Sequence, residues 1–149
     1  MAAAATDPTN PGNALASAVD DEIAKFRELQ ELLHGVRGDL QVLMGQQTEN
    51  EMVQTELNLL NKDTAGGHVY KRVGPVLVQQ DVEDAKETVA KRLEFIAKEQ
   101  DKVKAKMADM EKKLNEKGMK IQEMQSNMQR MTVQAVQAIQ QQHQQSQQS

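Results

Sequence analysis

Histidine and cysteine, the side chains that most often bind metals or act as nucleophiles, offer little chemistry in this sequence. The three histidines, His34, His68 and His143, are far apart and have no ligand spacing, and the chain contains no cysteine. A transition-metal site needs three or four suitable donors brought together. The sequence therefore predicts no metal site and no cofactor.

Carboxylates and glycines, the other frequent parts of active sites, occur here in structural patterns. Several acids stand four residues before a lysine, a spacing that stabilises an exposed helix face rather than a catalytic cleft. Gly66, Gly67 and Gly74 lack the Gly-Lys-Ser/Thr ending of a phosphate-binding loop and are typical of turns. We expect no catalytic residue and no enzyme. The pairs are Glu87 with Lys91, Glu94 with Lys98, Asp109 with Lys113 and Glu116 with Lys120.

The composition favours long helices over a closed globule. Of the 149 residues 38% are hydrophobic, but the only aromatic residues are Phe26, Phe95 and Tyr70, and tryptophan is absent. Aromatic side chains usually fill the interior of a globular domain, whereas paired helices pack through leucine, valine, isoleucine and methionine alone. The sequence predicts a mostly α-helical, elongated fold.

The distribution of charge limits the partners. The net charge is −4, and lysines and arginines are interleaved with acids, so no basic surface is available for a phosphate backbone. No segment approaches the roughly 20 apolar residues that span a bilayer. The absence of cysteine fits a reducing compartment. We expect a cytoplasmic protein that binds neither nucleic acid nor a membrane.

Hydrophobic periodicity divides the chain into successive segments. The stripe that begins at Phe26 and the one that begins at Val82 advance in steps of three and four residues, which is typical of a coiled-coil seam. Because the connection between them is short, the helices are expected to pair antiparallel. The predicted segments are a disordered leader at 1–16, a domain at 17–139 with helix 17–60, hairpin 68–80 and helix 82–139, and a flexible glutamine-rich tail at 140–149.

Two short β-branched runs between the helices predict a β-hairpin. A lone hairpin is marginally stable in water, and both of its edges carry unpaired backbone groups. Strands from other chains are therefore expected to complete its sheet; the alternative is a hairpin folded back onto its own helices. The residues assigned to assembly are Val69, Tyr70, Val73, Gly74, Pro75, Val76, Leu77 and Val78.

Three segments of the sequence resemble the β-class subunits of the prefoldin family. They are TENEMVQTELNLL at 48–60, YKRVGPVLV at 70–78 and EDAKETVAKRLEFI at 83–96, within a similarity that covers roughly 21–131. The resemblance implies an antiparallel two-helix coiled coil with one β-hairpin, whose hairpins form an intersubunit β-barrel. The implied complex is a heterohexamer of two α-type and four β-type subunits.

The same resemblance implies a function. Prefoldin is an ATP-independent holdase chaperone that captures unfolded polypeptides, in eukaryotes actin and tubulin, at the tips of its coiled coils. It passes them to the cytosolic chaperonin. The implied partners are therefore the other α- and β-type subunits, unfolded clients and the chaperonin.

A comparison of helix lengths predicts where clients bind. At 1.5 Å per residue, 19–60 spans roughly 63 Å and 82–139 roughly 87 Å, so the second helix outruns the first. Apolar groups without a partner form a binding surface, and methionine adapts to many shapes. The alternative is that the methionines only fill the seam, which gains weight if the first helix reaches back to Ala14. The residues assigned to client binding are Val19, Ile23, Phe26, Met124, Met128, Met131, Val136 and Ile139.

Two other functions remain open at this point. A structural coiled-coil tether would use the same long helices but has no need of a hairpin. A subunit of a prefoldin-like regulatory complex would share the whole architecture, and the residues do not separate it from the chaperone.

Overall fold

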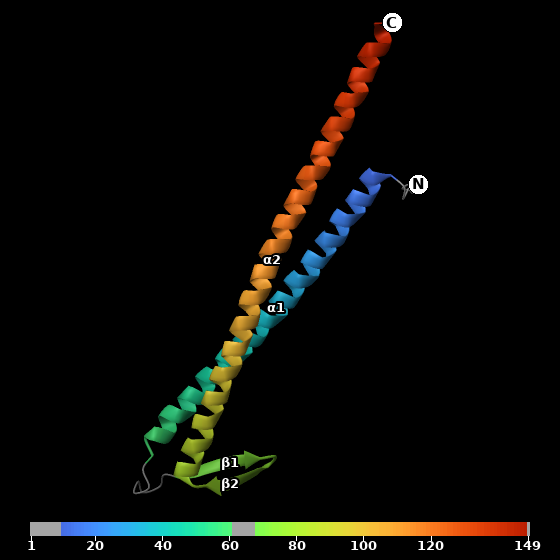
Figure 1. The fold of residues 1–149 in the computed structure, drawn as a ribbon. Helices are drawn as coiled ribbons and strands as arrows, with labels where there is room; N and C mark the ends of the chain where they lie inside the picture. Colours follow the sequence, from blue (N-terminus) through green and yellow to red (C-terminus); the bar gives the residue numbers. More distant parts are fainter. Residues whose placement is uncertain (1–9, 61–67, 149) are drawn as a thin grey trace. The chain divides into compact units, whose positions relative to one another are not determined.

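The computed structural model describes residues 10–60 and 68–148. Along the chain lie helix α1 (Pro11–Asn58), strands β1 (Val69–Val73) and β2 (Val76–Gln80), and helix α2 (Val82–Gln147) (Figure 1). The prediction of two long helices packed together with a hairpin between them is confirmed. In the described part of the chain, neither helix has an apolar stretch long enough to cross a membrane.

Helix α1 begins at Pro11 instead of the expected Ser17. The side chain of Asn10 accepts a hydrogen bond from the Gly12 amide at 3.0 Å, and its carbonyl accepts one from the Ala14 amide at 3.1 Å. This is an asparagine N-cap followed by proline at the first helical position, where its fixed φ and missing N–H are tolerated. Part of the predicted leader is thus helix, while residues 1–9 lie outside the described residues.

Helix α2 also continues past its predicted end. It reaches Gln147, whereas the sequence pattern placed its end at Ile139 and a flexible tail beyond it. Glutamine has nearly the helix propensity of glutamate and lysine, and no glycine or proline follows Gly118 to break the helix. Low sequence complexity therefore did not mean loss of helix here. Ser149 lies outside the described residues.

The chain forms two compact units, one of residues 1–33 with 109–149 and the other of residues 34–108. In the second unit, which holds the hairpin, Leu57, Ala85 and Val89 are buried together. The Lys86 ammonium donates to the Leu60 carbonyl at 3.2 Å, which ties the start of α2 to the end of α1. Half-buried residues complete this small core; they are Leu60, Val69 and Leu93.

Two glutamines form a polar contact between the helices of the hairpin unit. Gln100 is only 7% exposed, and its side-chain amide donates to the side-chain oxygen of Gln47 at 2.8 Å. Both residues occupy positions of the predicted apolar stripes. A buried polar pair of this kind stabilises one alignment of two helices over its neighbours, because any shift leaves both amides unpaired.

In the other unit, α1 and α2 pack through aliphatic side chains and one aromatic ring. Val19, Leu33, Met110 and Ile121 are buried there. Gly118 lies opposite the ring of Phe26, and a Cβ atom at this position would be in ordinary van der Waals contact with the ring at 3.5 Å. The space at this position therefore admits an alanine, and packing does not explain the glycine.

The hairpin is a two-stranded antiparallel sheet in which Val73 pairs with Val76 and Val69 with Gln80. The chain reverses at Gly74, whose φ of +58° lies in the left-handed region that other residues avoid. Pro75 follows it in the turn. The expected hairpin at 68–80 thus forms with strands of five residues each.

Candidate assembly and client-binding surfaces

Both faces of the hairpin expose apolar side chains. Residues paired across the strands lie on the same face, so Val73, Val76 and Val78 share one face. They are 49–57% exposed. On the opposite face Tyr70 is 55% and Leu77 is 65% exposed.

Among the described residues of the hairpin, those at its open end are the least exposed. Val69 and its partner Gln80 are half-buried, and Val69 packs against the core around Leu57. A groove of about 290 Å³ is lined by β1 together with the helices, among others by Val53, Tyr70 and Arg92. Hence the alternative in which the hairpin folds back and buries itself on its own helices is not the observed arrangement.

The hairpin also carries groups that favour a defined partner. In the described residues the sheet has two strands, so its outer backbone edges have no strand beside them. Lys71 and Arg72 stand on β1, and the Arg72 guanidinium donates to the Gly74 carbonyl at 3.3 Å. Edge backbone groups, a fixed register and charges together specify how a further strand can add.

Of the residues assigned to client binding on α1, none is fully exposed. Val19 is 5% exposed and packs in the helix pair, while Ile23 and Phe26 are half-buried. In this structure Val19 offers almost no surface to a ligand, and the ring of Phe26 faces Gly118. The α1 part of the predicted surface therefore consists of the exposed edges of Ile23 and Phe26.

The residues assigned on α2 change from half-buried to exposed along the helix. Met124 and Met128 are half-buried, in line with the alternative that they fill the seam once α1 extends back past Ala14. Met131 is 47% exposed, Val136 is 49% and Ile139 is 66%. Val133, absent from the predicted set, is also 50% exposed.

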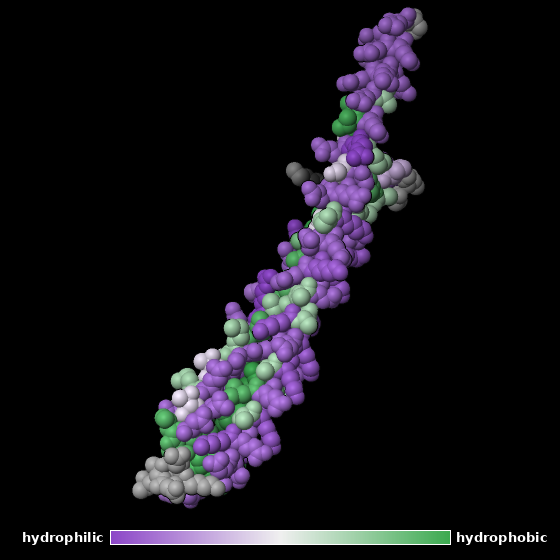
Figure 2. Space-filling view, turned by 60° about the vertical axis from the view of Figure 1, so that its left-hand side comes forward, coloured by the Kyte–Doolittle hydropathy of each residue, from purple (hydrophilic) through white to green (hydrophobic). Residues whose placement is uncertain are grey.

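Beyond Met128 the described part of α2 is exposed on every side. Every residue from 129 to 148 is exposed, and Figure 1 shows the red end of α2 continuing past the blue start of α1. In Figure 2 this end is mainly purple, with green apolar patches among the polar side chains. The geometry thus provides a single helix whose apolar groups face solvent.

A cluster of lysines around Glu22 joins α1 to α2 in the same unit. The Glu22 carboxylate, 11% exposed, accepts a hydrogen bond from Lys117 at 3.0 Å and lies 3.5 Å from the Lys120 ammonium and 3.6 Å from that of Lys25. The hydrogen bond from Lys117 lowers the pKa of Glu22 below its usual value; burial opposes this, and the charges of Lys117, Lys120 and Lys25 add to it. The carboxylate is thus held in its charged form.

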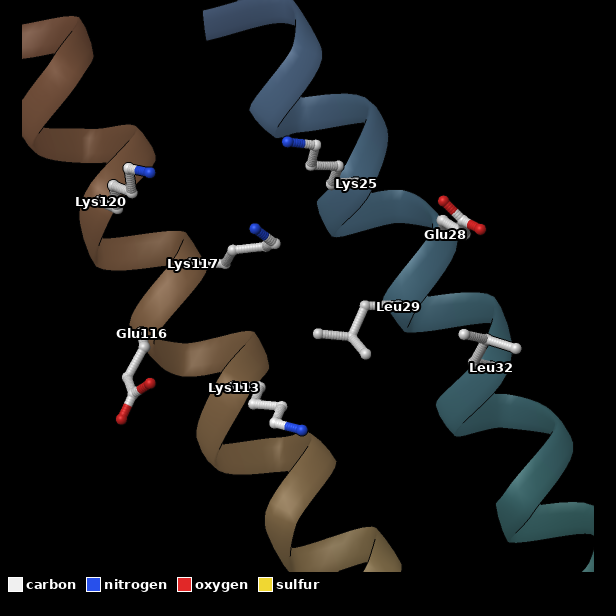
Figure 3. Close-up of a pocket in the computed structure, with 8 residues that line it drawn as sticks. All are labelled: Lys25, Glu28, Leu29, Leu32, Lys113, Glu116, Lys117 and Lys120. Carbon is white, nitrogen blue, oxygen red and sulfur yellow. The ribbon is translucent and has the colours of Figure 1, made fainter.

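Next to this ion cluster lies an open groove of about 500 Å³. Figure 3 shows Leu29 pointing from α1 toward α2, with Lys25, Lys113 and Lys117 around the gap. Glu28 and Glu116 point away from it. The sequence pattern missed the ion cluster, because Lys117 sits at a stripe position and its partner is remote in sequence.

Comparison with known proteins shows the family. The model of the family described as "Prefoldin subunit" matches residues 20–128. The chain belongs to the prefoldin family. It is 40% identical over 116 residues to the probable prefoldin subunit 6 of Caenorhabditis briggsae, covering 78% of this chain and 88% of the relative. It is 41% identical over 102 residues to prefoldin subunit 6 of Arabidopsis thaliana, covering 68% of this chain and 73% of the relative.

A solved structure agrees with the prefoldin β fold. The crystal structure of the prefoldin β subunit from Thermococcus strain KS-1 superposes with a TM-score of 0.66 at 22% identity. The match covers 71% of this chain and 90% of that one. As a prefoldin subunit, the chain has a chaperone role, belongs to a family of non-enzymatic subunits and is a component of the prefoldin complex.

The described residues of this prefoldin subunit also bear on metal binding. In 10–60 and 68–148, no three histidine, aspartate or glutamate side chains are close enough to hold a metal ion together.

Proposed function

We propose that this chain is a subunit of an ATP-independent holdase that captures unfolded polypeptides. Its hairpin joins it to α- and β-type subunits in a heterohexamer, and the helix ends remote in sequence from the hairpin hold the client. In line with the family resemblance, the clients include actin and tubulin in the cytoplasm, and they pass to the cytosolic chaperonin.

The observation that carries the proposal is the exposure of apolar side chains on an isolated helix. Met131, Val136 and Ile139 are each about half exposed or more. Full burial of such a side chain, away from water, is favourable by roughly 1.5–3 kcal/mol. Exposed apolar groups of this kind mark an interaction surface. A structural tether has no use for them, whereas a holdase needs a surface that accepts many sequences.

Truncation tests the proposal. A chain that ends at Ile121, assembled with the other subunits, retains the hairpin and most of the paired helices but lacks the exposed end of α2. We expect it to enter the complex with unchanged native mass and to lose suppression of the aggregation of an unfolded reporter, such as denatured actin.

A matched control keeps the helix length and changes polar positions. Gln125→Ser with Gln129→Ser alters two exposed polar side chains of the same segment and is expected to suppress aggregation as well as the unaltered complex. Full suppression by the chain that ends at Ile121 would contradict the proposal. Binding of the truncated chain to denatured actin at unchanged affinity would contradict it as well.

A further inference from the structure

Three lysines of α2 lie along the groove shown in Figure 3. Lys113, Lys117 and Lys120 follow one another in steps of four and three residues, which places them on the same side of the helix. Like charges at this spacing repel one another and weaken a helix. The net charge of the whole chain is −4, so this concentration of positive charge is opposite in sign to the rest of the molecule.

The acids nearby do not balance the lysines on the side of the groove. Three ammonium groups lie within 3.6 Å of a single carboxylate, that of Glu22; they belong to Lys25, Lys117 and Lys120. Three positive charges and one negative charge leave this cluster with two uncompensated positive charges. The two glutamates that line the groove point away from it in Figure 3. The groove is therefore short of negative charge.

The groove also has an apolar part, which α1 supplies. Leu29 and Leu32 line it and follow Lys25 in steps of four and three residues. Figure 3 shows Leu29 pointing toward α2, and Leu32 is 57% exposed. The groove volume of about 500 Å³ lies within the range of sites that hold ligands. A large apolar side chain placed in the groove would cover both leucines.

Lysines and leucines in one groove indicate an acidic protein segment as the ligand. A simple anion such as phosphate pairs with the lysines but leaves the leucines exposed to water. A purely apolar segment covers the ammonium groups without pairing them, which is costly. A segment with carboxylates on both sides of a large apolar side chain matches both parts. The lysines of α2 extend over about 10 Å, the length of roughly three residues of extended chain.

We propose that this groove is a docking site for an acidic segment of a partner protein, an interaction beyond the holdase function proposed above. The partner's apolar side chain contacts Leu29 and Leu32, and its carboxylates pair with the ammonium groups of Lys25 and Lys120, which are 61% and 59% exposed. None of the residues assigned to client binding lines the groove. The docking site is thus separate from the proposed client surface.

The test measures binding of a labelled synthetic peptide, in which glutamates flank two leucines, to the assembled complex by fluorescence anisotropy. We expect saturable binding that weakens by about fivefold or more between roughly 0.05 and 0.5 M salt, because salt screens exposed charges. A peptide with glutamine for each glutamate, or with serine for each leucine, should bind at least about fivefold more weakly. Equal binding of the serine peptide would show attraction of any anion and overturn the proposal. Absence of saturable binding at about 1 mM peptide would overturn it as well.

Substitution of two lysines tests whether the groove holds the peptide. Lys25→Gln with Lys120→Gln removes two positive charges and should weaken binding of the acidic peptide by about fivefold, in line with the modest strength of exposed ion pairs. Glu22 keeps its hydrogen bond from Lys117 at 3.0 Å in this variant, so the contact between α1 and α2 is retained.

A matched control removes the same amount of charge from the hairpin unit. Lys91→Gln with Lys98→Gln alters two lysines of α2 whose side chains are 73% and 70% exposed. We expect this control to bind the acidic peptide as well as the unaltered complex. Equal affinities of the two double variants would show that the groove lysines have no special role, and would overturn the proposal.

A chain that ends at Arg130 separates the groove from the proposed client surface. It keeps every residue that lines the groove and lacks Met131, Val136 and Ile139. We expect unchanged affinity for the acidic peptide, together with weaker suppression of the aggregation of denatured actin. Loss of peptide binding would place the peptide on the end of α2 and overturn the docking site, while the holdase function stands. Unchanged suppression with unchanged peptide binding would support the docking site and contradict the assignment of clients to the end of α2.

A crosslink locates the apolar side chain of the peptide. Because the chain has no cysteine, Leu32→Cys provides a single reactive thiol in the groove. A peptide that carries a thiopyridyl-activated cysteine in place of one leucine should react with position 32 at least about tenfold faster than with Met52→Cys, because docking raises its local concentration. Met52 is 64% exposed and lies in the other unit. Equal rates at the two positions would overturn the proposal.

Discussion

The hairpin and the C-terminal arm, residues 131–147 of α2, both expose apolar side chains. The polar groups around those side chains differ between the two regions. On the hairpin, Leu77 and Val73 lie beside charged residues and along backbone edges in a fixed register. On the arm, Val136 and Ile139 lie among neutral amides on a helix whose backbone is already hydrogen-bonded. Exposed apolar area alone therefore does not tell a specific surface from a promiscuous one.

The difference lies in the polar groups around the apolar ones. An open strand edge accepts another strand only where its donors and acceptors align, so a wrong register leaves them unpaired. A helix surface with glutamines imposes no such alignment. Under the proposed function, the hairpin binds particular neighbouring subunits and the end of α2 binds many unfolded segments. The following predictions address this contrast from the largest effect to the smallest.

The strongest test places charge on both surfaces. Val73→Asp with Leu77→Asp puts a carboxylate on each face of the hairpin, where burial of an unpaired charge in an assembly is prohibitive. We expect native mass spectrometry to show the variant as a monomer. The control Val136→Asp puts the same charge on the arm and should leave the mass of the complex unchanged. Intact complexes formed by the hairpin variant would contradict the proposed difference between the hairpin and the end of α2.

The next largest effect concerns the polar pair that aligns the helices in the hairpin unit. Gln47→Leu leaves the buried Gln100 amide without its partner, which should destabilise the helix pair by about 1–3 kcal/mol in thermal unfolding. Gln47→Leu with Gln100→Leu removes both polar groups and should restore or exceed the original stability. Equal stability in all three proteins would show that the amides do not hold the alignment.

A smaller effect is expected at the hairpin turn. Gly74 adopts a φ of +58°, and nothing lies within 4 Å of a Cβ atom placed there, so Gly74→Ala tests backbone strain alone. The left-handed conformation costs a non-glycine residue about 1–2 kcal/mol. We expect weaker assembly, seen as subunit dissociation at lower denaturant, with unchanged binding of an unfolded reporter per assembled complex. Gly38→Ala, at an equally open helical position, is the control and should not weaken assembly.

The smallest effect concerns the ion cluster in the unit that bears the arm. The pKa of Glu22 is lowered in the folded chain, so its contribution to stability is present above the ordinary value of 4.5 and is lost as the pH falls through the folded value. Glu22→Gln should therefore reduce stability at neutral pH only slightly and flatten the acid-induced loss below pH 4.5. Identical unfolding curves of both proteins from pH 7 to pH 3, by circular dichroism, would contradict this role.

The fold was largely predictable because its signals are local. Two β-branched runs around Gly74 and Pro75 define the hairpin, and three- and four-residue steps define the seams. The ends of the helices were harder to predict from the sequence. Asn10 and Pro11 resemble a turn in composition but form an N-cap, and the glutamine-rich end resembles a disordered tail but continues α2.

The surfaces were predicted less completely than the fold. The exposure of Met131, Val136 and Ile139 agrees with the length argument, whereas Val19 is buried in the helix pair. Glu22 and Lys117 are 95 residues apart in sequence, and their contact depends on how the two helices align, which no local pattern encodes. Client binding by these residues stays a prediction until the experiments above are done.

Among the described hairpin residues, Val69 at the open end packs against the core of the unit, whereas those from Val73 to Val78 are exposed. Substitutions between Val73 and Val78 therefore leave the packing of α1 against α2 untouched. Substitution of a few strand residues can in this way change which subunits bind the hairpin, while the stability of the helix pair stays the same.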